Sequence, residues 1–288
     1  MRYLSPIKIA DCQNTLGESC FWDKDTESLW WTDIEQKKIW QLNDKNEKKF
    51  FDLPDKAGFI LPRKKEGFII GFSKSICIAK NNFKTFEKIC DISPNLKTLR
   101  INDGKVDPFG GVVFGTMDAN PDRKNRKPIA SFYRLNPEGE LQELLTNITI
   151  ANGIAFSNDY KMYFADTPTN IVKVIDIQNK NFDLHRATLF INNQNQLGFP
   201  DGATVDQNNN YWLSLVHGGC IKCYDHLGQV ILQISLPTMT PTCCTFGGKN
   251  MNEIFITSLR KPDGNNDDGC LYKIISDQKG TEQKLAFL

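Results

Sequence analysis

Oxygen-bearing side chains recur at one position of a repeated pattern, directly before an apolar run. The position holds Glu18 in GESCFWD, Asn102 in RINDGKVD, Asn152 in IANGIAFSND and Asp201 in FPDGATVD. Asn102, Asn152 and Asp201 are separated by 50 and 49 residues, and Glu18, Asn102 and Asp201 each stand five residues before an aspartate. In RINDGKVD the neighbouring Asp103 is an alternative occupant. Side chains that recur with one period can meet in a repeat fold, so we expect these groups to share a site.

The shared site is suited to a divalent cation. Two carboxylates and two amides facing one another would be costly to bury unpaired. Glu18, Asn152 and Asp201 offer only oxygen ligands, which favour calcium, magnesium or manganese, while carboxylates also admit zinc. The alternative is that these are ordinary turn residues, because Asp-Gly and Asn-Gly are common turn dipeptides. Their recurrence at one period favours a metal site with open positions for water and substrate.

Such a site predicts hydrolysis of an ester or lactone. A cation with open positions polarises a carbonyl, and a nearby carboxylate such as Asp201 activates a water molecule. The sequence lacks a G-x-S-x-G motif, and His185, His217 and His226 have no serine or cysteine partner in a recognisable motif. A serine or cysteine nucleophile is therefore not expected. His217, in SLVHGG, either borders the site or is an ordinary histidine.

The elements that position these residues are short β-strands separated by Gly, Asn, Asp and Pro. Six units repeat along the chain, with corresponding strand positions 39 to 50 residues apart, at Leu29, Phe68, Val112, Met162, Tyr211 and Ile254. This period is that of a four-stranded propeller blade, whereas a two-domain β-sandwich does not explain it. We therefore predict an all-β six-bladed β-propeller over residues 1–288, one domain, with the N-terminal YLSPIKIA supplying the outer strand of the last blade. Four of the six innermost strands then start with a polar side chain at one end of a central channel.

Composition limits the partners and the location. Thirty-five basic and 34 acidic side chains leave a net charge of +1, so neither nucleic acid nor a membrane is an expected partner. We find no signal peptide and no membrane-spanning segment, and we expect a cytoplasmic protein with its nine cysteines reduced. Cys220 and Cys223 of CIKC should point to opposite faces of a strand rather than bind zinc. The basic run PDRKNRKP is either a solvated loop or a loop for an anionic substrate.

Several segments resemble a known family. LGESCFWD, RINDGKVDPFGGVVFGTMD, NGIAFSND, FPDGATVD and TCCTFGGKN are similar, in order and spacing, to motifs of the regucalcin/gluconolactonase family, also called the senescence marker protein family. The resemblance covers nearly the whole chain. It implies a six-bladed propeller that hydrolyses sugar lactones with one divalent metal ion.

The resemblance also implies roles for individual residues. Glu18, Asn152 and Asp201 would hold the metal, Asp201 would be the general base, and Arg100 and Asn102 would bind substrate. Where animal members read GTMAEE, this chain reads GTMDAN, so the substrate contact of the final glutamate falls on Asn120 and Asp118 moves the charge two residues earlier. The alternative functions are a non-catalytic, calcium-binding or regulatory propeller, and a hydrolase of phosphotriesters or aryl esters.

Overall fold

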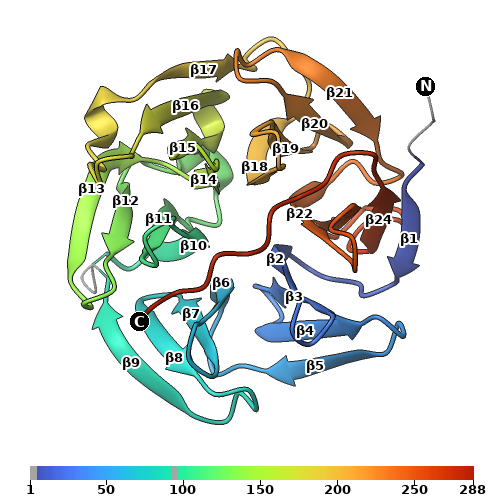
Figure 1. Cartoon of the computed structure of the whole chain (residues 1–288), viewed down its shortest axis with the longest axis horizontal. Coiled ribbons are helices and arrows are strands. Elements are labelled where there is room, and N and C mark those ends of the chain that lie inside the picture. Colours follow the sequence, from blue (N-terminus) through green and yellow to red (C-terminus); the bar gives the residue numbers. More distant parts are fainter. Residues whose placement is uncertain (1–4, 93–95) are drawn as a thin grey trace.

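A computed structural model describes residues 5–92 and 96–288 of the chain. Across these residues the strands form six four-stranded antiparallel sheets arranged around one axis (Figure 1). Each sheet is a blade whose first strand lies nearest the axis. The six corresponding positions from Leu29 to Ile254 each fall on the second strand of a blade. The predicted all-β six-bladed propeller is therefore confirmed.

The blades follow one another along the chain. Blades 1 to 3 contain, in order, β2 (Gly17–Asp23), β3 (Ser28–Asp33), β4 (Lys38–Asn43) and β5 (Lys48–Asp52); β6 (Ala57–Pro62), β7 (Phe68–Phe72), β8 (Ser75–Ala79) and β9 (Phe86–Asp91); and β10 (Leu99–Val106), β11 (Val112–Asp118), β12 (Ala130–Leu135) and β13 (Leu141–Ile148). Blades 4 to 6 contain β14 (Ala151–Phe156), β15 (Lys161–Asp166), β16 (Ile171–Asp176) and β17 (Thr188–Asn192); β18 (Phe199–Val205), β19 (Tyr211–Val216), β20 (Cys220–Tyr224) and β21 (Val230–Ser235); and β22 (Pro241–Gly247), β23 (Glu253–Ser258), β24 (Leu271–Ile275) and β1 (Ile7–Ala10). Short 3-10 helices in the connections are η1 (Arg123–Asn125), η2 (Thr167–Thr169) and η3 (Leu184–Arg186).

The ring is closed by pairing between the two ends of the chain. β1 pairs antiparallel with β24, and Ile7 lies opposite Lys273. The Lys8 ammonium group forms an ion pair of 2.8 Å with Asp267, in the loop before β24. The predicted closure by an N-terminal strand is confirmed for residues 7–10, while Tyr3 and Leu4 of the predicted segment lie outside the described residues.

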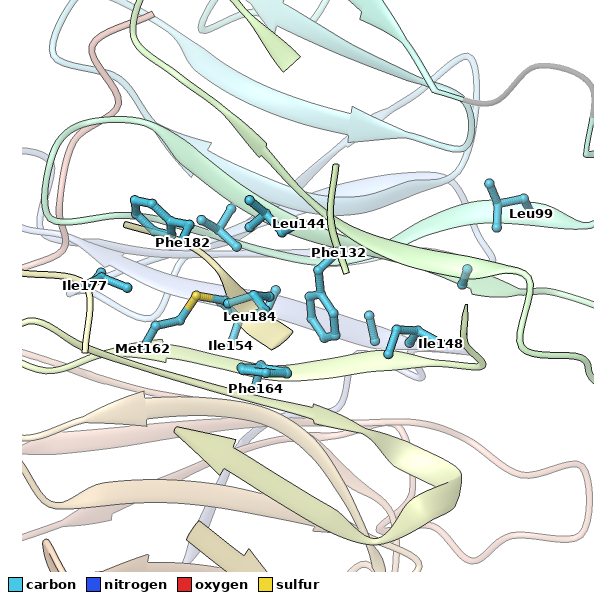
Figure 2. Packing of buried hydrophobic residues seen from close by; sticks show 13 residues of the cluster. Leu99, Phe132, Leu144, Ile148, Ile154, Met162, Phe164, Ile177, Phe182 and Leu184 are labelled. Atoms are coloured by element: carbon cyan, nitrogen blue, oxygen red, sulfur yellow. The ribbon is translucent and has the colours of Figure 1, made fainter. Parts of the chain in front are cut away.

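Apolar side chains between neighbouring blades form the core. The second strands of the blades are almost continuously buried because both of their faces are covered, whereas the outer strands are partly exposed. The cluster between blades 3 and 4 includes Phe132 and Leu144 from one blade and Ile154, Met162 and Phe164 from the other (Figure 2). Corresponding clusters lie at the other blade junctions. Packing between neighbouring blades therefore acts together with strand pairing inside each blade to hold the inner strands in place.

The segment after β24 crosses the face of the propeller on which the innermost strands end (Figure 1). The Ala286 N–H donates to the Pro62 carbonyl, and the Phe287 N–H donates to the Gly110 carbonyl. Residues 281–284 lie beside the last residues of β10, β14 and β18. This segment lies at the opposite end of the channel from the recurrent polar position.

The cysteines are placed as expected. All nine, which lie within the described residues, are free thiols. Cys220 packs into the cluster between blades 4 and 5, and Cys223 into the cluster between blades 5 and 6, so the two face opposite sides of β20. None of the short helices within the described residues has the length and apolar character needed to cross a membrane.

In blades 1, 3 and 5 the aspartate five residues after the recurrent polar position organises the hairpin that follows the inner strand. Asp206 is fully buried and accepts hydrogen bonds from the N–H groups of Asn208 and Asn210 and from the Trp212 indole N–H, at 2.9 to 3.0 Å. Asp107 holds the turn in blade 3 through the N–H groups of Phe109 and Gly111. The repeat thus has a site position at the start of the strand and a structural position at its end.

Replacing the structural aspartate should destabilise the fold. Asp206→Ala leaves the fully buried Trp212 indole N–H without an acceptor, so we expect the free energy of unfolding to fall by about 3 kcal/mol. Asp206→Asn keeps one acceptor oxygen and should lose less. Urea unfolding of the three proteins measures the difference, and an alanine variant as stable as the wild type would contradict the assigned role.

Candidate functional site

The innermost strands share a register shift at their starts. Every one of the six has a bulge or irregularity within its first residues, for example between Glu18 and Phe21 in β2 and between Pro200 and Ala203 in β18. A bulge changes the direction in which nearby side chains point. The side chains at the recurrent position therefore line the end of the channel instead of packing against the adjacent blade.

A cavity of about 960 Å³ opens at this end of the channel. Five of the six side chains predicted to bind metal or substrate line it, namely Glu18, Arg100, Asn102, Asn152 and Asp201. They come from β2, β10, β14 and β18, which belong to four different blades. The structure thus brings together residues that are far apart in the sequence. The sixth, Asn120, is not among the residues that line the cavity.

The carboxyl groups of Glu18 and Asp201 are both costly to ionise in this site. Burial raises the pKa of Glu18 well above its ordinary value, and the charge of Asp201 raises it further. Burial also raises the pKa of Asp201, with further increases from Cys243 and Asp103, and a hydrogen bond with Glu18 acts in the opposite direction. The surroundings of the pair therefore favour the protonated, uncharged form of both carboxyl groups.

A chain of hydrogen bonds connects the amides with blades 3, 4 and 5. The Arg100 guanidinium donates to Asn102 Oδ1 at 2.9 Å, and Asn102 Nδ2 donates to Asn152 Oδ1 at 3.0 Å. Asn152 Nδ2 then donates to the Thr167 hydroxyl, which donates to the Pro200 carbonyl, both at 2.9 Å. Each amide therefore has a fixed orientation. Asn152 and Asp201 both line the cavity, and Asp201 directly follows Pro200 in β18.

Arg100 is buried at the cavity wall. Burial lowers its pKa to about 10, while the acidic Glu35, Glu18 and Asp201 oppose that change. The side chain is therefore still charged at neutral pH. Its Nη1 donates to the Ile101 carbonyl and to Asn102, and its Nη2 has no acceptor among the described residues. The free N–H groups can donate to an oxygen of a bound ligand.

Asn120 and Asp118 belong to the loop that follows β11. The Asn120 side chain accepts a hydrogen bond from the Asp122 N–H, and its carbonyl accepts one from Arg126. Asp118 is buried and accepts hydrogen bonds from the N–H groups of Asn120 and Lys127. Burial would raise the pKa of Asp118, but these hydrogen bonds and one from Thr98 leave it lowered. Both residues shape the loop in this structure.

A third position of the repeat, at the end of the second strand, positions the site and was missed in the sequence. Asp33 accepts hydrogen bonds from the N–H groups of Thr15 and Leu16, just before Glu18, and Asp166 accepts from those of Thr149 and Ile150, just before Asn152. The signal was available, because WTD, TMD and FAD end the second strands of blades 1, 3 and 4. Asp118 is the member of this series in blade 3.

The sequence left open whether Asp103 and His217 face the channel. Asp103 accepts hydrogen bonds from the N–H groups of Gly104 and Ile154, so its carboxylate links blades 3 and 4 and does not line the cavity. His217 does line the cavity, with its ring edge-on to Phe199 at 6.5 Å between centroids. Burial lowers the pKa of His217, and Lys261 and Arg123 lower it further, so its imidazole is neutral at pH 7.

The donor set fits a hard divalent cation. Within residues 5–92 and 96–288 no three His, Cys, Asp or Glu side chains gather as metal ligands, so an ion would depend on two carboxylates and amide oxygen. Burial and neighbouring negative charge raise the pKa values of Glu18 and Asp201, and a cation bound to both carboxylates would oppose that increase. Oxygen ligands of this kind suit calcium, magnesium or manganese.

The chain is similar to several known proteins. Residues 16–260 match the family described as SMP-30/Gluconolactonase/LRE-like region. L-arabinolactonase of Azospirillum brasilense is 31% identical over 258 residues, which cover 88% of this chain and 83% of that protein. Regucalcin of Danio rerio is 27% identical over 296 residues, which cover 94% and 95% of the two chains. A solved structure of a luciferin-regenerating enzyme has a TM-score of 0.92 and 26% identity, and covers 99% of this chain and 100% of the other.

The carboxyl pair predicts a pH-dependent gain in stability from Asp201→Asn in the presence of chelator. The pKa values of both carboxyls are raised in the folded state, so their contribution is most favourable below the unfolded pKa and is lost as pH rises through the folded pKa. At pH 7 the variant should be more stable than the wild type, because the neutral amide has no charge to desolvate beside Glu18.

Urea unfolding at a series of pH values measures this difference. It should shrink towards zero below the unfolded carboxyl pKa of about 4, where both groups are protonated in both states. Glu18→Gln should give a similar gain. An Asp201→Asn variant that is less stable than the wild type at pH 7 would show that the carboxyls do not repel each other.

Proposed function

The chain belongs to the SMP-30/gluconolactonase/LRE-like family, and we propose that it hydrolyses a sugar lactone such as gluconolactone to the acid. The observation that carries the proposal is the meeting of two carboxyl groups, an amide oxygen and a buried arginine in one cavity. L-arabinolactonase, named for hydrolysis of a lactone, supports the reaction class. Both the substrate and the acid product then occupy the end of the channel.

Glu18, Asn152 and Asp201 would hold one divalent ion, which could be calcium, zinc, magnesium or manganese. Such an ion polarises the lactone carbonyl when bound. The naming of a relative as regucalcin, and of a solved structure from Agrobacterium tumefaciens as a calcium-binding protein, supports a metal ion of this kind. The Asn102 and Thr167 hydrogen bonds fix the Asn152 amide so that its oxygen is available at the cavity.

Asp201 acts as the general base. Its carboxylate takes a proton from water as the water oxygen bonds to the carbonyl carbon, and the proton then passes to the ring oxygen as the ring bond breaks. The Asp201 side chain lines the cavity, where a carboxylate can meet a water molecule beside the substrate carbonyl. A hydrogen-bonding role alone would not need a carboxyl group in so costly a position.

Arg100 and Asn102 bind the substrate. The free N–H groups of Arg100 donate to the carbonyl oxygen as negative charge develops on it. Asn102 Nδ2 donates hydrogen bonds to the Ala151 carbonyl and to Asn152 Oδ1, so both of its hydrogens have acceptors. Asn102 therefore binds substrate through Oδ1, which accepts a hydrogen bond from a sugar hydroxyl. Asn120 contributes through the shape of the loop after β11, since its side chain bonds within that loop.

Removal of the base should abolish turnover while the fold survives. We expect Asp201→Asn and Asp201→Ala to lower kcat by about a thousandfold, because general-base catalysis contributes about 10²–10⁴-fold. A pH-indicator assay of acid release from a panel of lactones, with chelator and with each candidate ion, measures the effect. The matched control is Asp206→Asn, at the other end of the same strand, which should retain activity.

Three results would count against the scheme. Full turnover by Asp201→Asn would remove the base. Tight calcium binding without acid release from any lactone would favour the alternative, a calcium-binding or regulatory propeller without turnover. Hydrolysis of aryl esters or phosphotriesters in place of lactones would reassign the substrate. The cytoplasmic location expected from the sequence stays a prediction, and fractionation of the native cells tests it.

A further inference from the structure

Basic side chains surround the mouth of the cavity. Among the described residues that line it, those with a positive charge are Arg100, Arg123, Lys124, Arg126, Arg260 and Lys261. Arg123, Lys124 and Arg126 come from the PDRKNRKP loop of blade 3, and Arg260 and Lys261 follow β23 of blade 6. Loops of two separate blades thus bring positive charge to one opening in a chain whose net charge is only +1.

These cations lack acidic partners. Within the described residues none of the six forms an ion pair, although seven other basic side chains do. The Asp122 carboxylate accepts hydrogen bonds from the Lys124 N–H and the Asn125 side-chain amide. The Asp118 carboxylate accepts hydrogen bonds from two backbone N–H groups. The acidic groups of the loop therefore hold the loop backbone and form no ion pair with Arg123 or Arg126.

The acidic residues of the cavity are also committed elsewhere. Glu35 forms an ion pair of 2.6 Å with Lys56. Glu18 and Asp201 lie at the strand starts, where the proposed ion would take their charge. Positive charge at the mouth is thus not balanced by the protein.

The cations are close enough to affect one another and the group between them. Burial and Arg123 lower the pKa of Arg126, which Asp118 opposes. Lys261 and Arg123, from opposite loops, both lower the pKa of His217, and Asp268 opposes them. A strongly anionic group at this mouth would relieve the repulsion and accept charge-assisted hydrogen bonds from guanidinium groups.

We propose that the preferred substrate is a lactone carrying an anionic group, a phosphate or a carboxylate, which Arg123, Arg126 and Lys261 bind while the lactone ring lies against Asp201 and Arg100. This inference rests on the proposed lactonase function and specifies its substrate class. The cavity has room for it, because 960 Å³ is near the upper end of the range, about 300–1,000 Å³, in which proteins bind drug-sized ligands. A single neutral sugar ring would leave the basic mouth without a partner.

The experiment compares three lactones with the intact protein. We expect kcat/KM for 6-phosphogluconolactone or glucaro-1,4-lactone to exceed that for gluconolactone by about tenfold or more, since a charge-assisted hydrogen bond contributes about 1.5–3 kcal/mol. The two anionic lactones separate phosphate from carboxylate recognition. Raising salt from about 0.01 M to about 1 M should reduce the preference, because the Debye length falls from about 30 Å to about 3 Å.

Variants locate the anion site. Arg123→Gln or Lys261→Gln should reduce the ratio of anionic to neutral kcat/KM by about tenfold, the effect of one lost charge-assisted hydrogen bond. Lys127→Gln is the matched control, because Lys127 is an exposed cation of the same loop that does not line the cavity. Its ratio should stay that of the wild type. An equal loss in Lys127→Gln would show a general charge effect and overturn the site.

The outcomes separate this inference from the proposed function. Turnover of gluconolactone as fast as that of both anionic lactones overturns the anion site and leaves the lactonase function intact. If no lactone is hydrolysed, calorimetry with gluconate and 6-phosphogluconate decides the point without turnover. If 6-phosphogluconate binds more tightly than gluconate, and Arg123→Gln weakens that binding, the anion site is supported without the lactonase function. Equal binding of the two acids overturns the anion site.

Discussion

The site depends on two carboxyl groups held together at the wall of one cavity. Glu18 and Asp201 come from blades on different sides of the channel, and only the packing of six blades keeps them close. Charge repulsion works against this arrangement, so the blade junctions must supply the opposing free energy. Bulges at the starts of the inner strands then direct the side chains into the channel. A cation bound between the two carboxylates would offset this repulsion.

Rigidity of the site comes from hydrogen bonds that cross blade boundaries. The series from Arg100 through Asn102, Asn152 and Thr167 ends on the Pro200 carbonyl, one residue before Asp201. Asp33 and Asp166 hold the segments that lead into β2 and β14. Since the Asn102–Asn152 and Thr167–Pro200 hydrogen bonds join neighbouring blades, a displaced blade would disturb several residues of the site at once. The amides therefore contribute to order as well as to binding.

The sequence predicted most of the fold and the deep part of the site, because a fixed period relates residues that meet at the axis. Glu18, Asn102, Asn152 and Asp201 share that period, and Arg100 came from the family resemblance. Loop geometry has no such period. The direction of Asp103 and the placement of Asn120 depend on which backbone N–H groups they meet, and Asp118 proved to be a member of the Asp33 and Asp166 series. The PDRKNRKP loop had two interpretations, and the sequence did not indicate that three of its cations line the cavity.

Closure of the ring by β1 has a consequence for folding. The partner of β1 is β24, nearly the whole chain length later, so during synthesis β1 must wait with its backbone N–H and C=O groups unpaired. Such an exposed strand edge can pair with another molecule and start aggregation. β1 has only four residues and includes Lys8, and short strands with a lysine are poor templates for pairing with a foreign edge. The same lysine later pairs with Asp267, so one side chain protects the nascent strand and then secures the closed ring.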